Sequence, residues 1–390
     1  MNKLHHHRAQ FPALSNKVYF NYGGQGPMAQ GSMDAITEAM VHIQNIGPFG
    51  NEAFRWISPQ IQGCREAIAS LFNVTSDTIT LTGNVTVGCN IAMWGIDWKP
   101  GDHLLLSDCE HPGVIATGQE IARRFGVEVT TCPLMATLNG GDPVSIIADH
   151  LRPQTRLVVL SHVLWNTGQV LPIDQIVPVC KSNNSRLLID AAQSVGVLPL
   201  DLTALGVDFY AFTGHKWLCG PAGVGGLYVH PEARESLHPT YIGLNGVTTN
   251  SQAQPTGWQP DGRRYEVSTL STPLYISLKQ AIAIHEQWGT AEARYQQILH
   301  NSAYLWQQLN SLPNVKCLKN SPPESGLVSF QITDQPSFKL VQFLESQNIL
   351  TRTIANPNCI RVSVHYLTLT SEIDQLIAAI ANTFCANLAP

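Results

Sequence analysis

The sequence predicts an α/β protein with a large domain on a mainly parallel sheet and a smaller α+β domain. Between about residues 75 and 230, strand-like apolar runs alternate with helix-like stretches, as in repeated βαβ units. Beyond a long helix-like run at 271–289, "SGLVSFQIT", "SFKLVQFLESQNI" and "CIRVSVHY" read as strand, helix and strand. The 390 residues, 44% of them hydrophobic, are enough to bury both cores.

The predicted elements follow in chain order. Residues 17–20 read as a short strand that enters the glycine-rich turn "NYGGQGP", and residues 31–46 have helical apolar spacing. Ligands of a parallel sheet bind beyond the carboxyl ends of its strands. We place the large domain at residues 18–262, and the N-terminal arm and small domain at 1–17 with 263–390. Strands are predicted in "TITLT", "HLLLS", "VEVTTCP", "RLVVLSHV", "RLLIDA", "VDFYAFT" and "VGGLYV", with helices at 113–126 and 143–152.

Composition excludes several classes of function. The formal charge is -5, and no long basic run suggests nucleic acid or a membrane surface as a partner. No apolar window approaches the roughly 18 residues of a membrane span, and the N-terminus lacks a signal-peptide core, so we expect a cytoplasmic protein. The nine cysteines form no Cys-x-x-Cys pair, so we expect no disulfide framework and no metal site. The triplet His5 to His7 is interpreted as a solvated tail.

Lys216 and Asp190 carry the chemical argument. Lys216 stands in "TGHKW", after the strand-like "VDFYAFT"; a buried lysine that loses its charge is a nucleophilic amine able to form a Schiff base. A surface turn is the alternative for Lys216 alone. Asp190 ends the run "RLLID", where a carboxylate can hold the proton of a pyridine nitrogen, although a helix N-cap is an alternative. Together the two residues predict pyridoxal phosphate as the cofactor.

The order strand-Asp-x-x-Gln followed by Thr-Gly-His-Lys resembles the class V branch of fold-type I pyridoxal-phosphate enzymes. Within it, the chain is most similar to the cysteine desulfurase-like proteins, and nearest to their cystine/cysteine carbon-sulfur lyases. The similarity covers nearly the whole chain and implies the fold-type I architecture. It also implies that Lys216 binds the cofactor covalently, that Asp190 pairs the pyridine nitrogen and that Gln193 approaches the ring hydroxyl.

A phosphate site is predicted in "TLTGNVTVGCN", where a strand runs into a helix whose first N-H groups are free. Val85 supplies a backbone N-H and Thr86 a hydroxyl, although Thr86 is also an ordinary capping residue. The resemblance adds Thr213 and His215 to the phosphate contacts. It also implies that His111, in "CEHPG", stacks on the ring and moves protons, against the alternative of a plain turn histidine.

Two further cofactor contacts come from the resemblance alone. The segment "SHVLWNTGQV" corresponds to one that supplies an asparagine near the ring hydroxyl. An ungapped comparison places Trp165 there, so both Trp165 and Asn166 stay open. Thr269, in "RRYEVSTL", corresponds to a threonine that reaches the phosphate of the partner subunit. It implies a homodimer with active sites at the interface.

Arg352 and Arg361 are the predicted substrate-binding residues, because a guanidinium can clamp an amino acid's carboxylate with two parallel hydrogen bonds. Desulfurases of the family carry a nucleophilic cysteine on a mobile segment between these two positions. Here that segment is the short "TIANPNCI", and its thiol, Cys359, belongs to the alternating run "CIRVSV". A thiol on a strand is poorly placed to accept sulfur, so elimination is the preferred chemistry.

The sequence therefore predicts a carbon-sulfur lyase that acts on L-cystine or L-cysteine by α,β-elimination, giving persulfide or sulfide, pyruvate and ammonia. Supply of sulfur to iron-sulfur acceptor proteins is a further expectation. Cysteine desulfurase, selenocysteine lyase, class V aminotransferase and epimerase remain alternatives within the enzyme interpretation. A catalytically silent scaffold on the same fold is the non-enzymatic alternative. The run "GPAGVGG" is no dinucleotide fingerprint, because its glycines precede a strand.

Overall fold

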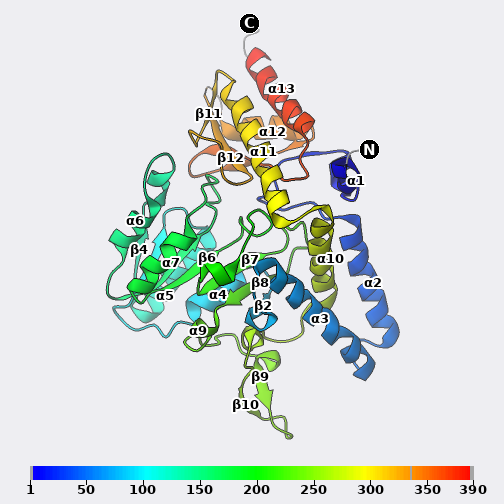
Figure 1. Ribbon diagram of the computed structural model, residues 1–390, viewed down its shortest axis with the longest axis vertical. Helices are drawn as coiled ribbons and strands as arrows, with labels where there is room; N and C mark the ends of the chain where they lie inside the picture. The colour runs from blue at the N-terminus through cyan, green and yellow to red at the C-terminus, as the bar shows by residue number, and fades with distance from the viewer. Residues whose placement is uncertain (1–2, 334–335, 387–390) are drawn as a thin grey trace.

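The computed structural model describes residues 3–333 and 336–386, with a larger domain below a smaller one (Figure 1). The large domain is built on a seven-stranded sheet of order β2-β8-β7-β6-β5-β3-β4. Neighbouring strands from β4 to β7 are parallel, whereas β8 runs antiparallel to β7 and β2. The predicted fold class is confirmed. The strands are β2 (Ile79–Thr82), β3 (His103–Ser107), β4 (Glu128–Cys132), β5 (Thr155–Ser161), β6 (Arg186–Asp190), β7 (Phe209–Thr213) and β8 (Gly225–Val229).

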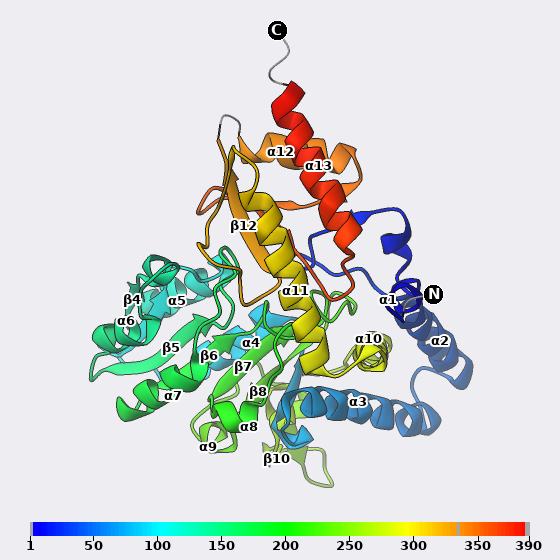
Figure 2. The ribbon, with the colours of Figure 1, turned by 45° about the horizontal axis from the view of Figure 1, so that its top comes forward.

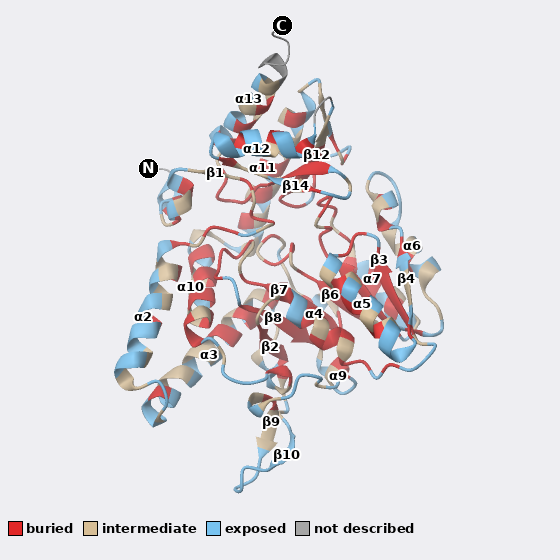
Figure 3. Ribbon diagram, turned by 180° about the vertical axis from the view of Figure 1, so that it is seen from behind, coloured by how far each residue is buried: buried red, intermediate tan, exposed pale blue. Residues whose placement is uncertain are grey.

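Helices cover both faces of this sheet, and the side chains along each strand alternate between two apolar cores. On β5, Val158 and Leu160 belong to one core, whereas Leu157 and Val159 belong to the other. Figure 3 shows the strands as a buried layer, as expected for a parallel sheet covered on both sides. The first core is covered by α3 (Asn51–Phe72), α6 (Pro143–His150), α7 (Ile173–Ser182), α8 (Leu202–Leu205) and α10 (Thr272–Trp288), and the second by α4 (Val85–Trp94), α5 (Pro112–Phe125) and α9 (Pro231–Arg234).

The small domain has an antiparallel four-stranded sheet of order β11-β12-β15-β14. Helix α11 rises from the large domain and packs beside this sheet with α12 and α13 (Figure 2). A two-stranded parallel pair, β1 with β13, lies at its side. The elements are β1 (Val18–Tyr19), α11 (Ala291–Asn310), β11 (Val315–Cys317), β12 (Leu327–Ile332), α12 (Ser337–Ser346), β13 (Ile349–Leu350), β14 (Arg352–Ile354), β15 (Cys359–Ser363) and α13 (Thr370–Ala386).

Two contacts cross the predicted domain boundaries at residues 17 and 262. Helix α10 packs against α2 and α3 in the large domain, because its apolar side chains complete the core there. Strand β1 pairs instead with β13 of the small domain. The division itself stays a prediction, and residues 1–2, 334–335 and 387–390 of the predicted arm and small domain lie outside the described residues. Helix α2 covers Gln30–Ile46.

Short elements complete the described chain. An antiparallel hairpin projects from the large domain, away from the small one (Figure 1). No helix in residues 3–333 and 336–386 is long and apolar enough to cross a membrane. The hairpin strands are β9 (Val247–Thr249) and β10 (Pro255–Trp258), and the 3-10 helices span Pro12–Ser15, Ser76–Thr78, Leu134–Thr137, Leu244–Gly246 and Gly262–Tyr265.

The interpretation of the histidine triplet as a solvated tail is wrong for His7. Helix α1 (Lys3–Arg8) docks on the junction of the domains, and His7 is only 5% exposed. Its Nε2 lies 3.1 Å from the hydroxyl of Tyr366, which is 2.6 Å from Nδ1 of His285. Nε2 of His285 donates to the carbonyl of Leu218 at 2.8 Å, so Nδ1 is unprotonated and accepts from Tyr366. This series of hydrogen bonds connects the N-terminal helix to the turn that carries Lys216.

The buried histidines make stability depend on pH. Burial lowers the pKa of His285 from 6.5 to about 3, so only the unfolded chain gains this proton between those values. The free energy of unfolding should therefore fall as the pH drops below about 6.5, with His285 contributing up to about 1.4 kcal/mol per pH unit. Urea unfolding of the wild type and His285→Gln from pH 7 to 4 should give a shallower pH dependence for the variant. Parallel curves would contradict the neutral, buried state of His285.

Candidate active site

A cavity of about 400 Å3 opens where β5, β6 and β7 reach their carboxyl ends, and strands of the small domain close it from the other side. This is where a parallel sheet is expected to bind its ligand. The cavity is lined by Gly23, Gly24, Asn84, Val85, Thr86, His111, Pro112, Ser161, Val163, Trp165, Asp190, Ala192, Gln193, His215, Lys216, Arg352 and Arg361. Most of the predicted site residues are therefore brought together.

Lys216 follows β7 in a tight turn, in which the Cys219 N-H donates to the Lys216 carbonyl at 3.0 Å. Gly26 crosses over this turn, and a side chain there would come within 2.2 Å of the same carbonyl oxygen. Burial lowers the pKa of Lys216 to about 8, although the nearby Asp190 acts in the opposite direction. At pH 7 about a tenth of Lys216 is therefore neutral and nucleophilic, and this fraction grows as the pH rises through about 8.

Asp190 is buried at the end of β6, where its Oδ1 accepts the Ala192 N-H at 2.9 Å. No helix begins here, so the helix N-cap alternative does not apply. Burial raises the pKa of Asp190, while the Ala192 N-H and the cation Lys216 oppose that rise. Gln193, in the same turn, donates to the Gly23 carbonyl at 2.9 Å and accepts from the indole of Trp217 at 2.8 Å. Its side chain is thereby held at the wall of the cavity.

His111 caps helix α5, and its Nδ1 accepts the Gly113 N-H at 3.2 Å. In a neutral ring the proton is therefore on Nε2. Burial lowers the pKa of His111, with further contributions from the cations Lys216 and Arg352, whereas Asp190 opposes the shift. The ring lies edge-on to Trp165, with centroids 6.2 Å apart. His111 is thus a neutral imidazole at the cavity wall, able to stack on a planar ligand and to move a proton.

The N-terminus of α4 faces the same cavity. Asn84 caps the helix by accepting the Val87 N-H at 3.0 Å, and Val85 and Thr86 form its first turn. Helix N-termini favour anions, through free N-H groups and the helix dipole. His215 also lines the cavity, and its Nδ1 lies 2.7 Å from the Thr213 hydroxyl. Thr213 itself does not line the cavity, so in this structure it acts on the site through His215.

Arg361 is the second buried cation of the cavity. Only 2% of the residue is exposed, and its Nη1 donates to the Trp165 carbonyl at 2.7 Å. Its Nε has no partner among the described residues. Burial, and next the neighbouring Arg352, lower the pKa of Arg361 to about 9. Arg352 is exposed and lies opposite Arg361 in the ladder of β14 and β15. The described lining thus contains three basic side chains, those of Lys216, Arg352 and Arg361, and one carboxylate, that of Asp190. This excess of positive charge favours an anionic ligand.

Besides Thr213, two more predicted contacts, Asn166 and Thr269, are not among the residues that line this cavity. Asn166 does not line it and donates to the Asn356 carbonyl at 3.3 Å, whereas Trp165 lines it. Thr269 is exposed and lines a second cavity of about 1100 Å3, which shares Asn84 and Thr86 with the first. The assignments of Asn166 and Thr269 to the cofactor stay predictions.

None of the described thiols lines the cavity. Cys359 is fully buried in β15, where burial raises its pKa to about 11. The segment between Arg352 and Arg361 forms the hairpin of β14 and β15, with only residues 355–358 between the strands. The eight cysteines whose side chains the structure describes are buried, and none lines the cavity.

Sequence reasoning missed several contributors to the site. Gly23 and Gly24 line the cavity. The sequence predicts the run "GGQG" as a turn, but its position depends on the bridge between Asn21 and Ser363 of the small domain, which is distant in sequence. Glu110 is a buried carboxyl that accepts the Ser161 N-H at 3.0 Å and its hydroxyl at 2.8 Å. Burial raises the pKa of Glu110 to about 7, and Asp190 adds to the shift. The sequence signal that could have identified Glu110 as part of the site is its position directly before His111.

Comparison with known proteins identifies the family. The class-V aminotransferase model matches residues 33–378. The chain belongs to this family. A cysteine desulfurase of Klebsiella pneumoniae (strain 342) is 27% identical, over 96% of each chain. Two solved structures of C-DES are 50% identical to this class-V chain and cover 96% of it and 99% of their own chains.

The C-DES structures also overlay closely on this class-V chain. One is a lysine-to-alanine variant with glycine covalently linked to the pyridoxal-phosphate cofactor, with a TM-score of 0.95. The other is a complex of the cystine C-S lyase C-DES with its reaction product cysteine persulfide, with a TM-score of 0.94. These likenesses extend over the whole fold rather than over one motif.

The donor set of this class-V cavity fits pyridoxal phosphate. An amine of lowered pKa, a carboxylate at a strand end and a helix N-terminus match the aldehyde, the ring nitrogen and the phosphate of that molecule. The cavity volume lies in the range of small-molecule sites. The excess of basic groups also matches the negative charge of the phosphate.

The assignment of Lys216 is tested by covalent labelling. We expect pyridoxal phosphate and borohydride to label the wild-type chain at Lys216, faster as the pH rises through about 8, because the neutral amine reacts. Lys216→Ala should lose this label. Lys319→Ala is the matched control, since Lys319 is also buried but lies outside the cavity. Peptide mapping that finds the main label elsewhere would contradict the assignment.

Proposed function

We propose that this class-V protein is a pyridoxal-phosphate-dependent carbon-sulfur lyase that eliminates the sulfur substituent of L-cystine, and less readily of L-cysteine. The single observation that carries the proposal is a cavity with a basic, carboxylate-binding wall and no thiol among its lining residues. The likeness to the cystine lyase C-DES over nearly the whole chain supports the same activity. Fold alone does not decide the reaction, so the residues of the cavity carry the argument.

Pyridoxal phosphate, when bound, supplies an electron sink for negative charge at the α-carbon of an amino acid. Lys216 would hold the cofactor covalently, and its amine, with a pKa lowered to about 8, would take the proton from the α-carbon. Asp190 would hold the proton of the ring nitrogen. Gln193 and His111 would fix the ring from its edge and face, and His111 can pass a proton to a departing group.

The phosphate would be held at the N-terminus of α4, by the Val85 N-H and the Thr86 hydroxyl, with His215 beside it and Thr213 behind His215. Thr269 of a second subunit would complete this end of the site. Exposed apolar side chains border the cavity of Thr269, which supports a homodimer that covers them. They include Tyr241 at 76% exposure and Val267 at 40%.

Arg361 and Arg352 favour cystine over cysteine. L-cystine carries two carboxylates, and these residues provide one guanidinium for each. In the proposed reaction, the bond between the β-carbon and sulfur of cystine breaks and the sulfur leaves as cysteine persulfide. With one water, the remaining carbon skeleton becomes pyruvate and ammonia. A persulfide is a weaker base than sulfide and therefore a better leaving group.

Desulfuration is the alternative chemistry, and the curated relatives at 26–27% identity carry the name cysteine desulfurase. That chemistry needs an enzyme thiolate beside the substrate. Burial raises the pKa of both Cys359 and Cys219, and neither thiol lines the cavity, which favours elimination. The persulfide product would be a sulfur donor for iron-sulfur acceptor proteins. Eight buried free cysteines suit a reducing, cytoplasmic location.

The proposal predicts the behaviour of Cys359→Ser. No thiol takes part in elimination, so the variant should keep most of its activity on cystine and still form pyruvate. Cys317→Ser is the matched control, because Cys317 is an equally buried strand thiol of the small-domain sheet. Coupled pyruvate assays and alanine analysis report both outcomes. Elimination would be replaced by desulfuration if the wild type formed alanine and Cys359→Ser, but not Cys317→Ser, lost sulfur release.

Arg361→Lys should separate substrate binding from cofactor binding. Lysine keeps the charge but not the paired donors of guanidinium, so we expect KM for cystine to rise by about tenfold or more, as for one lost charged hydrogen bond. The visible spectrum of the bound cofactor should stay near that of the wild type. An unchanged KM would place the substrate carboxylate elsewhere in the cavity.

A further inference from the structure

A buried ion pair outside the Lys216 cavity joins helix α3 to the segment that carries Thr269. Only 5% of the Arg65 side chain and 2% of the Glu266 side chain are exposed. Nη1 of Arg65 donates to Oε1 of Glu266 at 2.6 Å, and Nη2 donates to Oε2 at 3.3 Å. A buried ion pair often adds no stability over apolar residues of similar size, so its presence calls for another reason.

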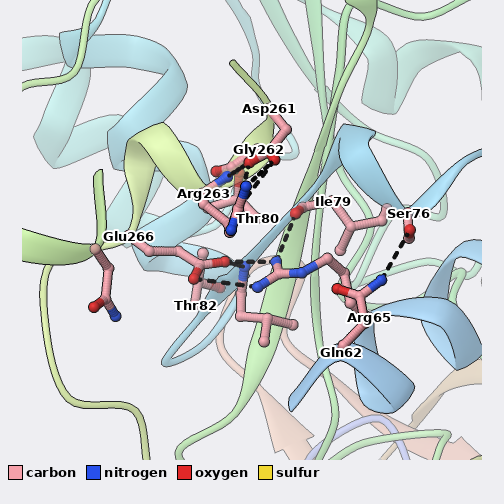
Figure 4. Close-up of polar contacts among 12 residues, drawn as sticks. Gln62, Arg65, Ser76, Ile79, Thr80, Thr82, Asp261, Gly262, Arg263 and Glu266 are labelled. Carbon is pink, nitrogen blue, oxygen red and sulfur yellow. Dashed lines mark hydrogen bonds and ion pairs between the residues drawn. The ribbon is translucent and has the colours of Figure 1, made fainter. Parts of the chain in front are cut away.

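The pair also satisfies the free edge of the large sheet. Strand β2 is the outer strand and pairs only with β8. Nη1 of Arg65 donates to the Ile79 carbonyl at 2.8 Å (Figure 4). The Leu81 N-H donates to Oε1 of Glu266 at 2.9 Å. These buried backbone groups would otherwise lack partners. The pair therefore fixes β2 as a neighbouring strand would.

Backbone contacts hold the segment before Glu266 against the same strand. The Thr80 hydroxyl donates to the Gly262 carbonyl at 2.7 Å. A side chain at Gly262 would come within 2.4 Å of the Ile79 carbonyl oxygen, so only glycine permits this approach. On the far side, the Asn245 amide donates to the Ser268 carbonyl at 2.6 Å. Segment 262–268 is thus held on both sides.

Strand β2 and segment 262–268, which the ion pair joins, both lead to the region of Asn84, Thr86 and Thr269. Strand β2 ends at Thr82, directly before the N-terminus of α4, where Asn84 is the cap. Glu266 is followed closely by Thr269, which lines the second cavity with Asn84 and Thr86. Asn84 and Thr86 also line the cavity of Lys216. The ion pair therefore sets the spacing between two walls of the end of the site that favours a phosphate.

We propose that Arg65 and Glu266 are positioning residues for the phosphate of the cofactor. They do not line the Lys216 cavity; they act by holding β2, and hence the first turn of α4, in register with the Thr269 segment. The inference rests on the proposed function, because the phosphate belongs to pyridoxal phosphate. It adds a requirement to those of the Lys216 chemistry: binding through the phosphate depends on a buried ion pair at the free edge of β2, whose Glu266 lines the second cavity with Asn84 and Thr86.

Pyridoxal, which lacks the phosphate, separates this role from a general effect on the site. We expect Glu266→Gln, which keeps the size and removes the charge, to weaken binding of pyridoxal phosphate to the full-length apoprotein by about tenfold or more. Binding of pyridoxal should stay within about twofold of the wild type. Fluorescence and absorbance titrations measure both dissociation constants without any turnover.

The matched control is Glu372→Gln. Glu372 forms a comparably buried ion pair with Arg8, with both side chains 10% exposed and neither residue lining either cavity. Its variant should lower the melting temperature while leaving the ratio of the two dissociation constants unchanged. A similar change of that ratio in Glu372→Gln would show a general effect of lost stability, and the inference would fail.

A double variant keeps the test decisive if Glu266→Gln folds poorly. Arg65→Met with Glu266→Leu removes both charges and fills the space, so its melting temperature should exceed that of Glu266→Gln, which leaves the Arg65 charge buried without its partner. Its affinity for pyridoxal phosphate should remain weak, because the contacts to Ile79 and Leu81 are gone. Recovery of that affinity together with stability, or equal losses for both ligands, would overturn the inference. Failure of the wild-type chain to bind either ligand would instead overturn the proposed function, and this inference with it.

Discussion

The site depends on placing more positive than negative charge inside one cavity. Lys216 and Arg361 are buried, Arg352 is exposed, and Asp190 is the only carboxylate among the described residues that line the cavity. Burial lowers the pKa of both buried cations, because desolvation disfavours their charged forms. The two extensive apolar cores offset that cost. An anionic amino acid and a phosphate supply the missing negative charge.

The sequence predicted the parts of the site that local patterns encode. Asp190 and Lys216 each follow a buried strand, so their common edge was readable from the alternation of strands and helices. The positions of Gly23 and His7 could not be predicted from local patterns, because the contacts that place them come from the small domain. His7 and its partner Tyr366, for example, are 359 positions apart in the sequence. Helix α3 was missed because it contains Pro59 and an exposed, mostly polar face. Arg65 and Glu266 read alone as ordinary charged residues.

The two domains share the site. Arg361 comes from β15 of the small domain, yet its guanidinium donates to the Trp165 carbonyl of the large domain. The N-terminal segment also connects the two domains. The backbone of Phe20 is hydrogen-bonded to β13 and β15 of the small domain, and the Gly26 N-H donates to the His215 carbonyl of the large domain. A shift of the small domain would therefore move the proposed substrate-binding group and the Lys216 turn together. This coupling suits a reaction in which water must be kept from the α-carbon.

The balance of products formed from L-cystine by the wild-type protein tests the central claim most directly. With the thiols buried and the cavity basic, each cystine consumed should yield one pyruvate, one ammonia and one cysteine persulfide. Mass spectrometry should find no enzyme-bound persulfide on any cysteine. Alanine in place of pyruvate, or sulfur carried on an enzyme thiol, would contradict elimination in this cavity.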